Sequence, residues 1–138
     1  SLGRRRVARP TVALLWTLFD DTRLSVAAKE ILLDDPLDIF ASVTNLCEIS
    51  LKFGIGKLDR QGVAPEDLPL IAERECGIET LPLSVGLVTT FHQLPRTGHK
   101  DPFDRLIIWQ AIREDLVLIS KDDKMEPYRR DFGLKTFW

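Results

Sequence analysis

The stretch "LDIFASVTNLCEISLKFG", Leu37–Gly54, decides the fold that we expect for this chain. Its first part, residues 37–42, is short and apolar with an Ile-Phe pair, which predicts a buried strand. The apolar residues that follow, Leu46, Ile49 and Phe53, recur at helical spacing and share one face. A buried strand that leads directly into a helix is typical of α/β domains.

The same alternation of strand and helix continues along the rest of the chain. Pro65 and Gly77 bracket one helix, because Pro suits the first helical turn and Gly favours the turn that closes a helix. The almost continuously apolar run "DLVLIS", at 115–120, is typical of a strand covered on both faces. The further predicted helices are 11–19, 26–35, 85–94 and 124–129, and the further predicted strands are 78–83 and 134–138. This order predicts an α/β domain with a mainly parallel sheet, whose site lies beyond the carboxyl ends of the strands.

Length and composition predict a single globular domain over residues 1–138, with 44% hydrophobic and 29% charged residues. A formal net charge of −2 means that any surface for nucleic acid is local. The apolar runs are too short to span a membrane, and the basic start lacks the apolar stretch and cleavage site of a secretory signal. We therefore expect no membrane association.

The cysteines and histidines give no sign of a disulfide or a zinc site. Cys47 and Cys76 lie far apart without a CxxC pattern, which favours free, buried thiols in a reducing compartment, so we expect a cytoplasmic protein. His92 and His99 lack the spacing of zinc ligands.

A second stretch, "GHKDPFDRLIIWQ" at 98–110, begins another helix. Asp101 at the N-cap, Pro102 in the first turn and Asp104 three residues after the cap resemble a capping box. Both carboxylates meet the positive end of the helix dipole, which stabilises each by about 0.3–1 kcal/mol. Helix initiation alone therefore explains this motif.

Other acidic residues favour a shared acidic site in addition to the helix cap. Glu48 lies within the apolar helix that follows strand 37–42, where an unpaired carboxylate is unfavourable. Asp122 comes just after strand 115–120. In a parallel α/β sheet, Glu48, Asp104 and Asp122 converge on the same edge. Separate caps and surface charges remain the alternative.

Clustered carboxylates need a neutralising charge. Two charges about 4 Å apart repel by about 4 kcal/mol at an effective dielectric of about 20. Protons or a divalent cation relieve this repulsion, and oxygen ligands without His or Cys suit Mg²⁺ or Mn²⁺. Such ions activate water and stabilise the leaving oxygen in phosphodiester hydrolysis.

Three segments, "SVTNLCEISLKFGIGKL", "HKDPFDRLIIWQA" and "LVLISKDDKM", in this order and spacing resemble the PIN domain, specifically the VapC-like toxins of bacterial toxin–antitoxin pairs. The resemblance runs from about residue 11 to residue 138. It implies a three-layer α/β/α fold and a Mg²⁺- or Mn²⁺-dependent endoribonuclease that cleaves RNA. It also implies a VapB-like antitoxin partner and a homodimer.

The resemblance assigns roles residue by residue. Glu48 matches the family's acidic position in the helix after the second strand, Asp104 matches the third acidic position, and Asp122 matches the last. Ser120 occupies the usual Ser/Thr place before that last acid. These three acids are the expected catalytic metal ligands. Asp101 is an accompanying acid that could join them, although its position favours the cap.

The first acidic position departs from the family. The family opens with a central strand that ends in Asp followed by Thr; here Thr11 matches, but Pro10 replaces the Asp. The preceding "GRRRVA" predicts a poor central strand, because Pro is disfavoured there and arginines would have to be buried or displaced. Two explanations are open: a catalytically impaired relative, or a non-native segment over residues 1–10, for example from a reading-frame error. The abrupt boundary and the intact remainder favour the second.

Basic and aromatic residues supply weaker signals. Two basic groups flank the predicted acidic edge and could hold RNA phosphates, although solvated loop charge explains each residue equally well. The N-terminal arginines are expected to form a tail, and the tryptophans to make core or dimer contacts. The flanking groups are Arg96, His99, Lys100 and Lys121, Lys124, Arg129, Arg130; the arginines are Arg4, Arg5, Arg6 and Arg9; the tryptophans are Trp16, Trp109 and Trp138.

Three hypotheses follow from the sequence. The leading one is a metal-dependent endoribonuclease whose activity is abolished by Asp104→Asn. The second is a PIN-like module that binds an antitoxin or RNA without cleaving it, so that Asp104→Asn leaves binding unchanged. The third, weaker hypothesis is phosphatase-like or DNA-directed use of the same acids, which a comparison of RNA with DNA substrates separates.

Overall fold

The computed structural model describes residues 6–9, 38–56, 62–96, 101–120 and 123–137. The helices predicted over 11–19 and 26–35 lie outside these ranges. Pro10 and Asp122 also lie outside them.

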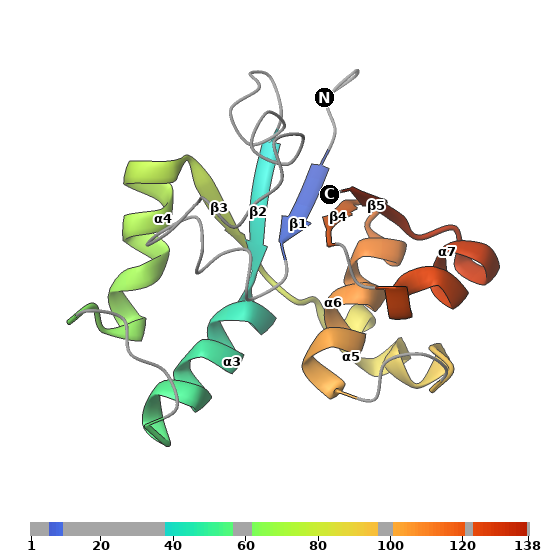
Figure 1. Ribbon diagram of the computed structural model, residues 1–138, viewed down its shortest axis with the longest axis horizontal. Coiled ribbons are helices and arrows are strands. Elements are labelled where there is room, and N and C mark those ends of the chain that lie inside the picture. The colour runs from blue at the N-terminus through green and yellow to red at the C-terminus, as the bar shows by residue number, and fades with distance from the viewer. Residues whose placement is uncertain (1–5, 10–37, 57–61, 97–100, 121–122, 138) are drawn as a thin grey trace.

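A five-stranded sheet forms the centre of the fold (Figure 1). Its spatial order is β3-β2-β1-β4-β5, and every neighbouring pair is parallel. The strands are β1 Arg6–Arg9, β2 Asp38–Ser42, β3 Ile78–Leu81, β4 Val117–Ile119 and β5 Lys135–Phe137. The prediction of an α/β domain with a mainly parallel sheet is therefore confirmed.

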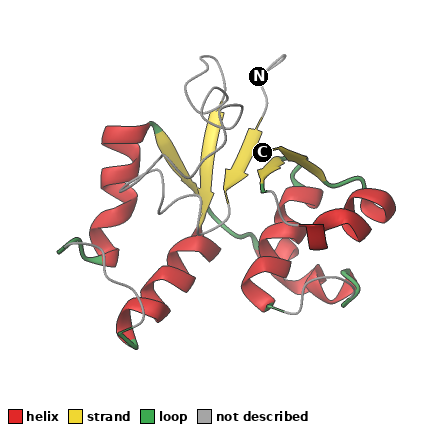
Figure 2. Cartoon of the chain, viewed as in Figure 1, coloured by secondary structure: helices red, strands yellow, loops and turns green. Residues whose placement is uncertain are grey.

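Helices alternate with these strands along the chain (Figure 2). Sequence signals account for their limits: Ser84 caps α5 through the Leu87 N–H at 3.0 Å, and Gly77 and Gly133 close α4 and α7 with left-handed φ angles. The α-helices are α3 Val43–Gly54, α4 Leu68–Cys76, α5 Val85–Thr90, α6 Pro102–Arg113 and α7 Glu126–Phe132. The short 3₁₀ helices are η2 Pro65–Asp67, η3 Phe91–Gln93 and η4 Asp123–Met125.

Strand β2 shows that both faces of the sheet are covered. Ile39 and Ala41 pack in one buried cluster with residues of α3 and α4, whereas Phe40 packs in a second cluster with α5, α6 and α7. Successive strand residues point to opposite faces, so two layers of helices enclose the sheet. This is the expected three-layer α/β/α arrangement.

Helix α6 is the most deeply buried helix of the larger cluster. Ile107, Ile108 and Ala111 are almost completely enclosed, and so is Trp109. The Trp109 Nε1–H donates to the Leu87 carbonyl at 3.1 Å, which satisfies the indole donor. Trp109 is therefore a core residue, as predicted, while Trp16 and Trp138 lie outside the described residues.

The N-terminal arginines correct one prediction. The sequence indicated a poor central strand and a tail, but Arg6–Arg9 form β1, the middle strand of the sheet. Arg4 and Arg5 lie outside the described residues. Ala8 pairs with Phe40 on one side and with Leu118 on the other. Strand pairing uses backbone N–H and C=O groups, which arginine supplies as well as valine does, and Pro10 follows the strand rather than interrupting it. That residues 1–10 are a non-native segment remains a prediction.

None of the helices in the described ranges is long and apolar enough to cross a membrane.

Cys47 corrects a further prediction. Its thiol is free, as expected, but the residue is exposed rather than buried. The reason is its position on α3, where Asn45 and Ile49 face the interior and Cys47 does not.

Candidate functional site

The candidate site lies at the carboxyl edge of the central strands. The chain passes from β1 to β2 and β3 on one side and to β4 and β5 on the other, so the strand order reverses at β1. In open α/β sheets, ligands bind beyond the carboxyl ends of the strands at such a reversal. Helix α3 leaves the carboxyl end of β2 directly, and α6 packs against α3 (Figure 1).

A buried capping box fixes the start of α3. The Ser42 side chain accepts a hydrogen bond from the Thr44 N–H at 3.0 Å, and the Asn45 Oδ1 accepts one from the Ser42 N–H at 2.9 Å. Ser42 and Asn45 are fully buried. Reciprocal bonds of this kind satisfy backbone donors that a helix start leaves unpaired. The direction of α3 is therefore set at its first residue.

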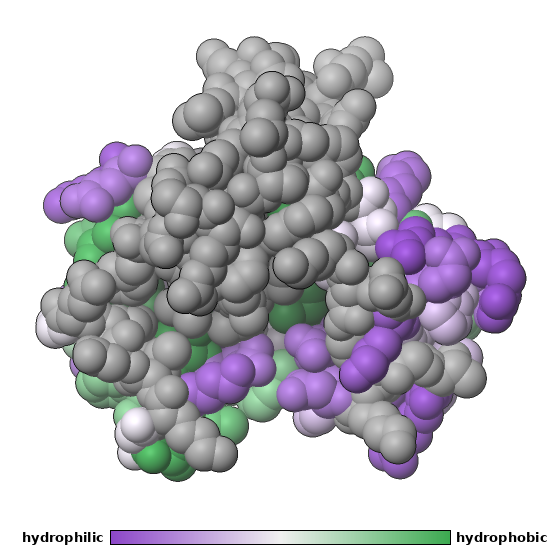
Figure 3. Space-filling model, viewed as in Figure 1, coloured by the Kyte–Doolittle hydropathy of each residue, from purple (hydrophilic) through white to green (hydrophobic). Residues whose placement is uncertain are grey.

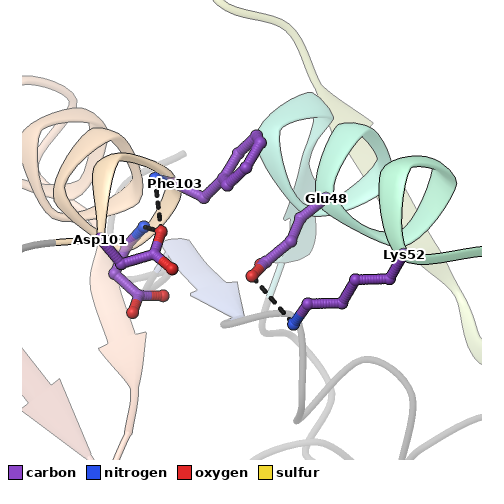
Figure 4. A network of polar contacts seen from close by, with 5 residues as sticks. Glu48, Lys52, Asp101 and Phe103 are labelled. Atoms are coloured by element: carbon purple, nitrogen blue, oxygen red, sulfur yellow. Dashed lines mark hydrogen bonds and ion pairs between the residues drawn. The ribbon is translucent and has the colours of Figure 1, made fainter. Parts of the chain in front are cut away.

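Glu48 lies one turn further along α3. It is only 6% exposed, which is unusual for a carboxylate. Lys52, one helical turn beyond, places its Nζ 3.0 Å from the Glu48 Oε2 (Figure 4). This ion pair supplies a positive charge to a carboxylate that would otherwise be costly to bury.

Asp101 caps α6, as the sequence predicted. Its Oδ1 accepts hydrogen bonds from the Phe103 N–H at 2.8 Å and from the Asp104 N–H at 3.3 Å. Asp101 itself is exposed, and Phe103 extends from the start of α6 towards α3 (Figure 4). One carboxylate oxygen of Asp101 is thus occupied in holding the helix start.

Asp104 is half-buried in the first turn of α6, where the helix dipole favours negative charge. Glu48 and Asp104 therefore belong to two helices that pack against each other at the carboxyl side of the sheet. Hydrophilic residues gather over this region, at the lower centre of the molecular surface (Figure 3).

The other predicted ligand positions fall at the limits of the described chain. Ser120, half-buried, follows β4 directly, and Asp122 lies in the gap after it. Pro10 lies in the gap after β1. Within the described ranges, no three His, Cys, Asp or Glu side chains come together as a group that could hold a metal ion. The roles of Glu48, Asp104, Asp122 and Asp101 as metal ligands remain predictions.

Two side chains near the site were not singled out in the sequence. Lys52 could have been found from its i,i+4 spacing to Glu48, which is the favourable order for an ion pair on a helix. Among the residues that the structure describes, Thr44 at the start of α3 has a buried hydroxyl with no hydrogen-bond partner. No sequence pattern indicates such a group, because burial depends on tertiary packing.

The basic residues of α7 are engaged in local ion pairs. The Arg129 Nε lies 2.9 Å from the Glu126 Oε2, and the Arg130 Nε lies 3.0 Å from the Asp131 Oδ1. The hydrogen bond from Arg130 lowers the pKa of Asp131, and the same contact raises the pKa of Arg130. Neither Arg130 nor Asp131 belongs to the predicted acidic edge.

Comparison with known proteins gives the family. A family model described as the PIN domain matches residues 11–131. The chain therefore belongs to the PIN domain family. No curated protein sequence matches it.

Solved structures share the fold across almost the entire chain. VapBC2 from Rickettsia felis, bound to a DNA fragment from its promoter, has a TM-score of 0.66 at 17% identity, covering 96% of this chain and 97% of that chain. VapBC-1 from nontypeable Haemophilus influenzae has a TM-score of 0.66 at 15% identity and covers 96% of both chains. DNA-bound VapBC from Salmonella typhimurium has a TM-score of 0.61 at 18% identity, covering 96% and 97%.

Proposed function

We propose that the protein is a Mg²⁺- or Mn²⁺-dependent endoribonuclease, the toxin of a VapBC-type toxin–antitoxin pair, acting in the cytoplasm. The observation that carries the proposal is the arrangement of Glu48 and Asp104. These two acids, with low exposure, lie on packed helices beyond the carboxyl ends of parallel strands. Ligands of open α/β sheets bind at this edge, which favours a ligand-binding role for the two acids.

The donor chemistry fits a hard divalent cation. Glu48 and Asp104 offer carboxylate oxygens, and burial of Glu48 makes a positive partner favourable. Asp122, which follows β4, would complete the set of metal ligands, with Asp101 as an accompanying acid. When bound, the ion would polarise the phosphoryl group and lower the pKa of a coordinated water.

The residues of this chain would prepare the site in three ways. The Asp101 cap fixes the first turn of α6 and hence the position of Asp104. The Ser42–Asn45 capping box fixes the start of α3 and hence the direction from which Glu48 approaches. The positive end of the α6 dipole favours negative charge at Asp104, as a metal ligand requires.

The partner and substrate are part of the same proposal. VapBC-5 from Mycobacterium tuberculosis, which shares this fold with a TM-score of 0.56, is by its name a member of the VapBC family of toxin–antitoxin systems, which supports a VapB-like antitoxin for this chain. The substrate is RNA, and the protein assembles as a homodimer. Basic residues that follow the predicted acidic edge, such as Lys124, offer contacts for phosphates.

The test is cleavage of a mixed RNA substrate by purified protein in Mn²⁺, Mg²⁺ or EDTA, with a DNA substrate in parallel. We expect cleavage of RNA only, in either metal and not in EDTA. A Pro10→Asp variant restores the first acid of the family and should cleave faster. If neither protein cuts RNA in either metal, the nuclease proposal is wrong.

The alternative is a catalytically impaired PIN-fold module that binds an antitoxin or RNA without cleavage. Pro10 at the first acidic position is the observation that favours it. This alternative predicts that the unmodified chain is inactive, that Pro10→Asp gains activity, and that Asp104→Asn leaves partner binding unchanged. Titration of labelled RNA with each variant, read by fluorescence anisotropy, separates binding from cleavage.

A further inference from the structure

The ion pair between Glu48 and Lys52 joins two side chains of very different exposure. The Glu48 side chain is 8% exposed, whereas the Lys52 side chain is 41% exposed, and their closest atoms are 3.0 Å apart. Both residues lie on α3, one turn apart, and Glu48 is the more deeply buried acid of the candidate site. Lys52 therefore reaches from solvent into the site (Figure 4).

A buried carboxylate requires positive charge. Within the described residues Lys52 supplies it, and a bound divalent cation would supply it as well. The Lys52 ammonium is already in contact with the Glu48 Oε2, and a divalent cation would use the same carboxylate. Two cations close to one carboxylate repel each other. Binding of the metal ion and retention of the Lys52 contact are therefore mutually unfavourable.

We propose that Lys52 is an internal counter-cation that occupies Glu48 in the metal-free protein and competes with the divalent ion for it. This inference rests on the proposed function, in which Glu48 is a metal ligand. Lys52 is a positioning residue: it acts on metal occupancy through Glu48. It sets the metal concentration at which the site fills.

Replacement of Lys52 by a metal ion at Glu48 needs little structural change. Lysine has a flexible four-carbon stem and a strongly hydrated head, so the partly exposed ammonium can return to water without any movement of α3. Glu48 cannot make the corresponding move, because its carboxylate is enclosed. The metal ion would thus displace the lysine and leave the carboxylate in place.

A second ion pair provides a matched control. The Lys135 Nζ lies 2.9 Å from the Asp115 Oδ1, but both side chains are exposed, at 59% and 80%. Asp115 precedes β4 and Lys135 begins β5, so this pair lies at the amino ends of the strands, opposite the candidate site. Removing either lysine changes the net charge equally.

The test is isothermal titration of the full chain with Mn²⁺, using the unmodified protein, Lys52→Met, Lys52→Arg and Lys135→Met. We expect Lys52→Met to lower the Mn²⁺ dissociation constant by about threefold to tenfold, because the competing contact is lost. Lys52→Arg should bind Mn²⁺ as weakly as the unmodified protein, and Lys135→Met should not alter the constant. Without metal, Lys52→Met should melt at a lower temperature than the unmodified protein.

A purely structural lysine gives a different result. It predicts a lower melting temperature for Lys52→Met with an unchanged or weaker Mn²⁺ affinity, which would overturn this inference while leaving the proposed function intact. If neither the unmodified protein nor Lys52→Met binds Mn²⁺, both proposals are wrong. If only Lys52→Met binds, the inference holds and the unmodified chain is shown to be blocked by its own lysine.

A measurement on the unmodified protein covers the case in which Lys52→Met does not fold. Amine acetylation followed by mass spectrometry reports how accessible each lysine is. We expect Mn²⁺ to increase the labelling of Lys52 by about threefold or more, matching the expected competition, and to leave Lys135 unchanged. Equal labelling of Lys52 with and without Mn²⁺ would contradict the exchange.

Discussion

The starts of α3 and α6 are both capped by side chains, but the caps of α3 are neutral and buried, whereas the cap of α6 is acidic and exposed. Helix α3 begins with a neutral, fully buried pair, Ser42 and Asn45, and has no acid in its first turn. Helix α6 begins with Asp101, which is exposed, and carries Asp104 in its first turn. Both starts satisfy backbone N–H groups, but only the second brings negative charge to the helix dipole.

This difference separates stability from chemistry. Buried, neutral caps stabilise the fold, because their loss leaves buried polar groups without a hydrogen-bond partner and out of reach of water. An exposed acidic cap contributes less to stability and leaves carboxylates available to a ligand. We therefore expect substitutions at the start of α3 to act mainly on folding, and substitutions at the start of α6 to act mainly on cleavage.

The largest expected effect is on activity. Asp104→Asn should reduce Mn²⁺-dependent RNA cleavage by at least about 100-fold, because a neutral amide is a poor ligand for a hard cation. The free energy of unfolding should change by less than about 1 kcal/mol, the scale of the lost interaction with the dipole. Gel-based cleavage rates and urea denaturation measure the two quantities. Full activity of this variant would remove Asp104 from the site.

The largest effect on stability is expected at the other helix. Asn45→Ala should lower the free energy of unfolding by about 2–3 kcal/mol, because the buried Ser42 N–H loses its acceptor. Urea denaturation measures this change, with Ser84→Ala as the comparison, since that exposed cap of α5 should cost only about 1 kcal/mol. Equal losses of unfolding free energy in the two variants would show that burial of a cap has no influence on how much it stabilises the protein.

A smaller effect is expected from the cap of α6. Asp101→Ala should cost about 1 kcal/mol of stability, because the Phe103 and Asp104 N–H groups lose their shared acceptor. Asp101→Asn keeps an acceptor and should cost little. Cleavage by the Asn variant tests the division of roles: retained activity assigns Asp101 to the cap, whereas activity lost as fully as in Asp104→Asn assigns it to the metal.

The smallest effect is expected away from both helix starts. Asp131→Asn removes the exposed ion pair with Arg130 and should shift the melting temperature by less than about 1 °C at neutral pH. Cleavage should be unchanged. A loss of cleavage here would mean that α7 contributes to RNA binding. Calorimetry measures the melting temperature, and fluorescence anisotropy measures RNA binding.

The fold was largely predictable because its signals are local. Gly77 after the α4 pattern, Ser84 before α5 and the apolar run of β4 each mark an element without reference to its neighbours. β1 was not predictable in this way. Arginine is not among the β-branched and aromatic residues that mark strands, and the place of β1 is set by pairing with β2 and β4, which no local pattern records.

The candidate site was predictable only in part. Asp101 as a cap followed from its spacing to Pro102 and Asp104, and the structure confirms that bond pattern. The low exposure of Glu48 followed from its apolar neighbours. The Lys52 contact has a signal in the sequence, its i,i+4 spacing to Glu48, which was not used. The Thr44 hydroxyl, which has no hydrogen-bond partner within the described part of the chain, has no such signal.

The central position of β1 has a consequence for the order of events during folding. Its two neighbouring strands lie at very different distances along the sequence: Arg9 pairs with Ala41, and Val7 pairs with Val117. Among the five strands, β1 emerges from the ribosome first, and β2, β3 and helices α3 to α6 must follow before its second neighbour, β4, appears. Closing so long a loop is slow, so the two halves of the sheet should form early and join late. Synthesis of β4 and β5, rather than emergence of β1, would then time the appearance of the finished sheet.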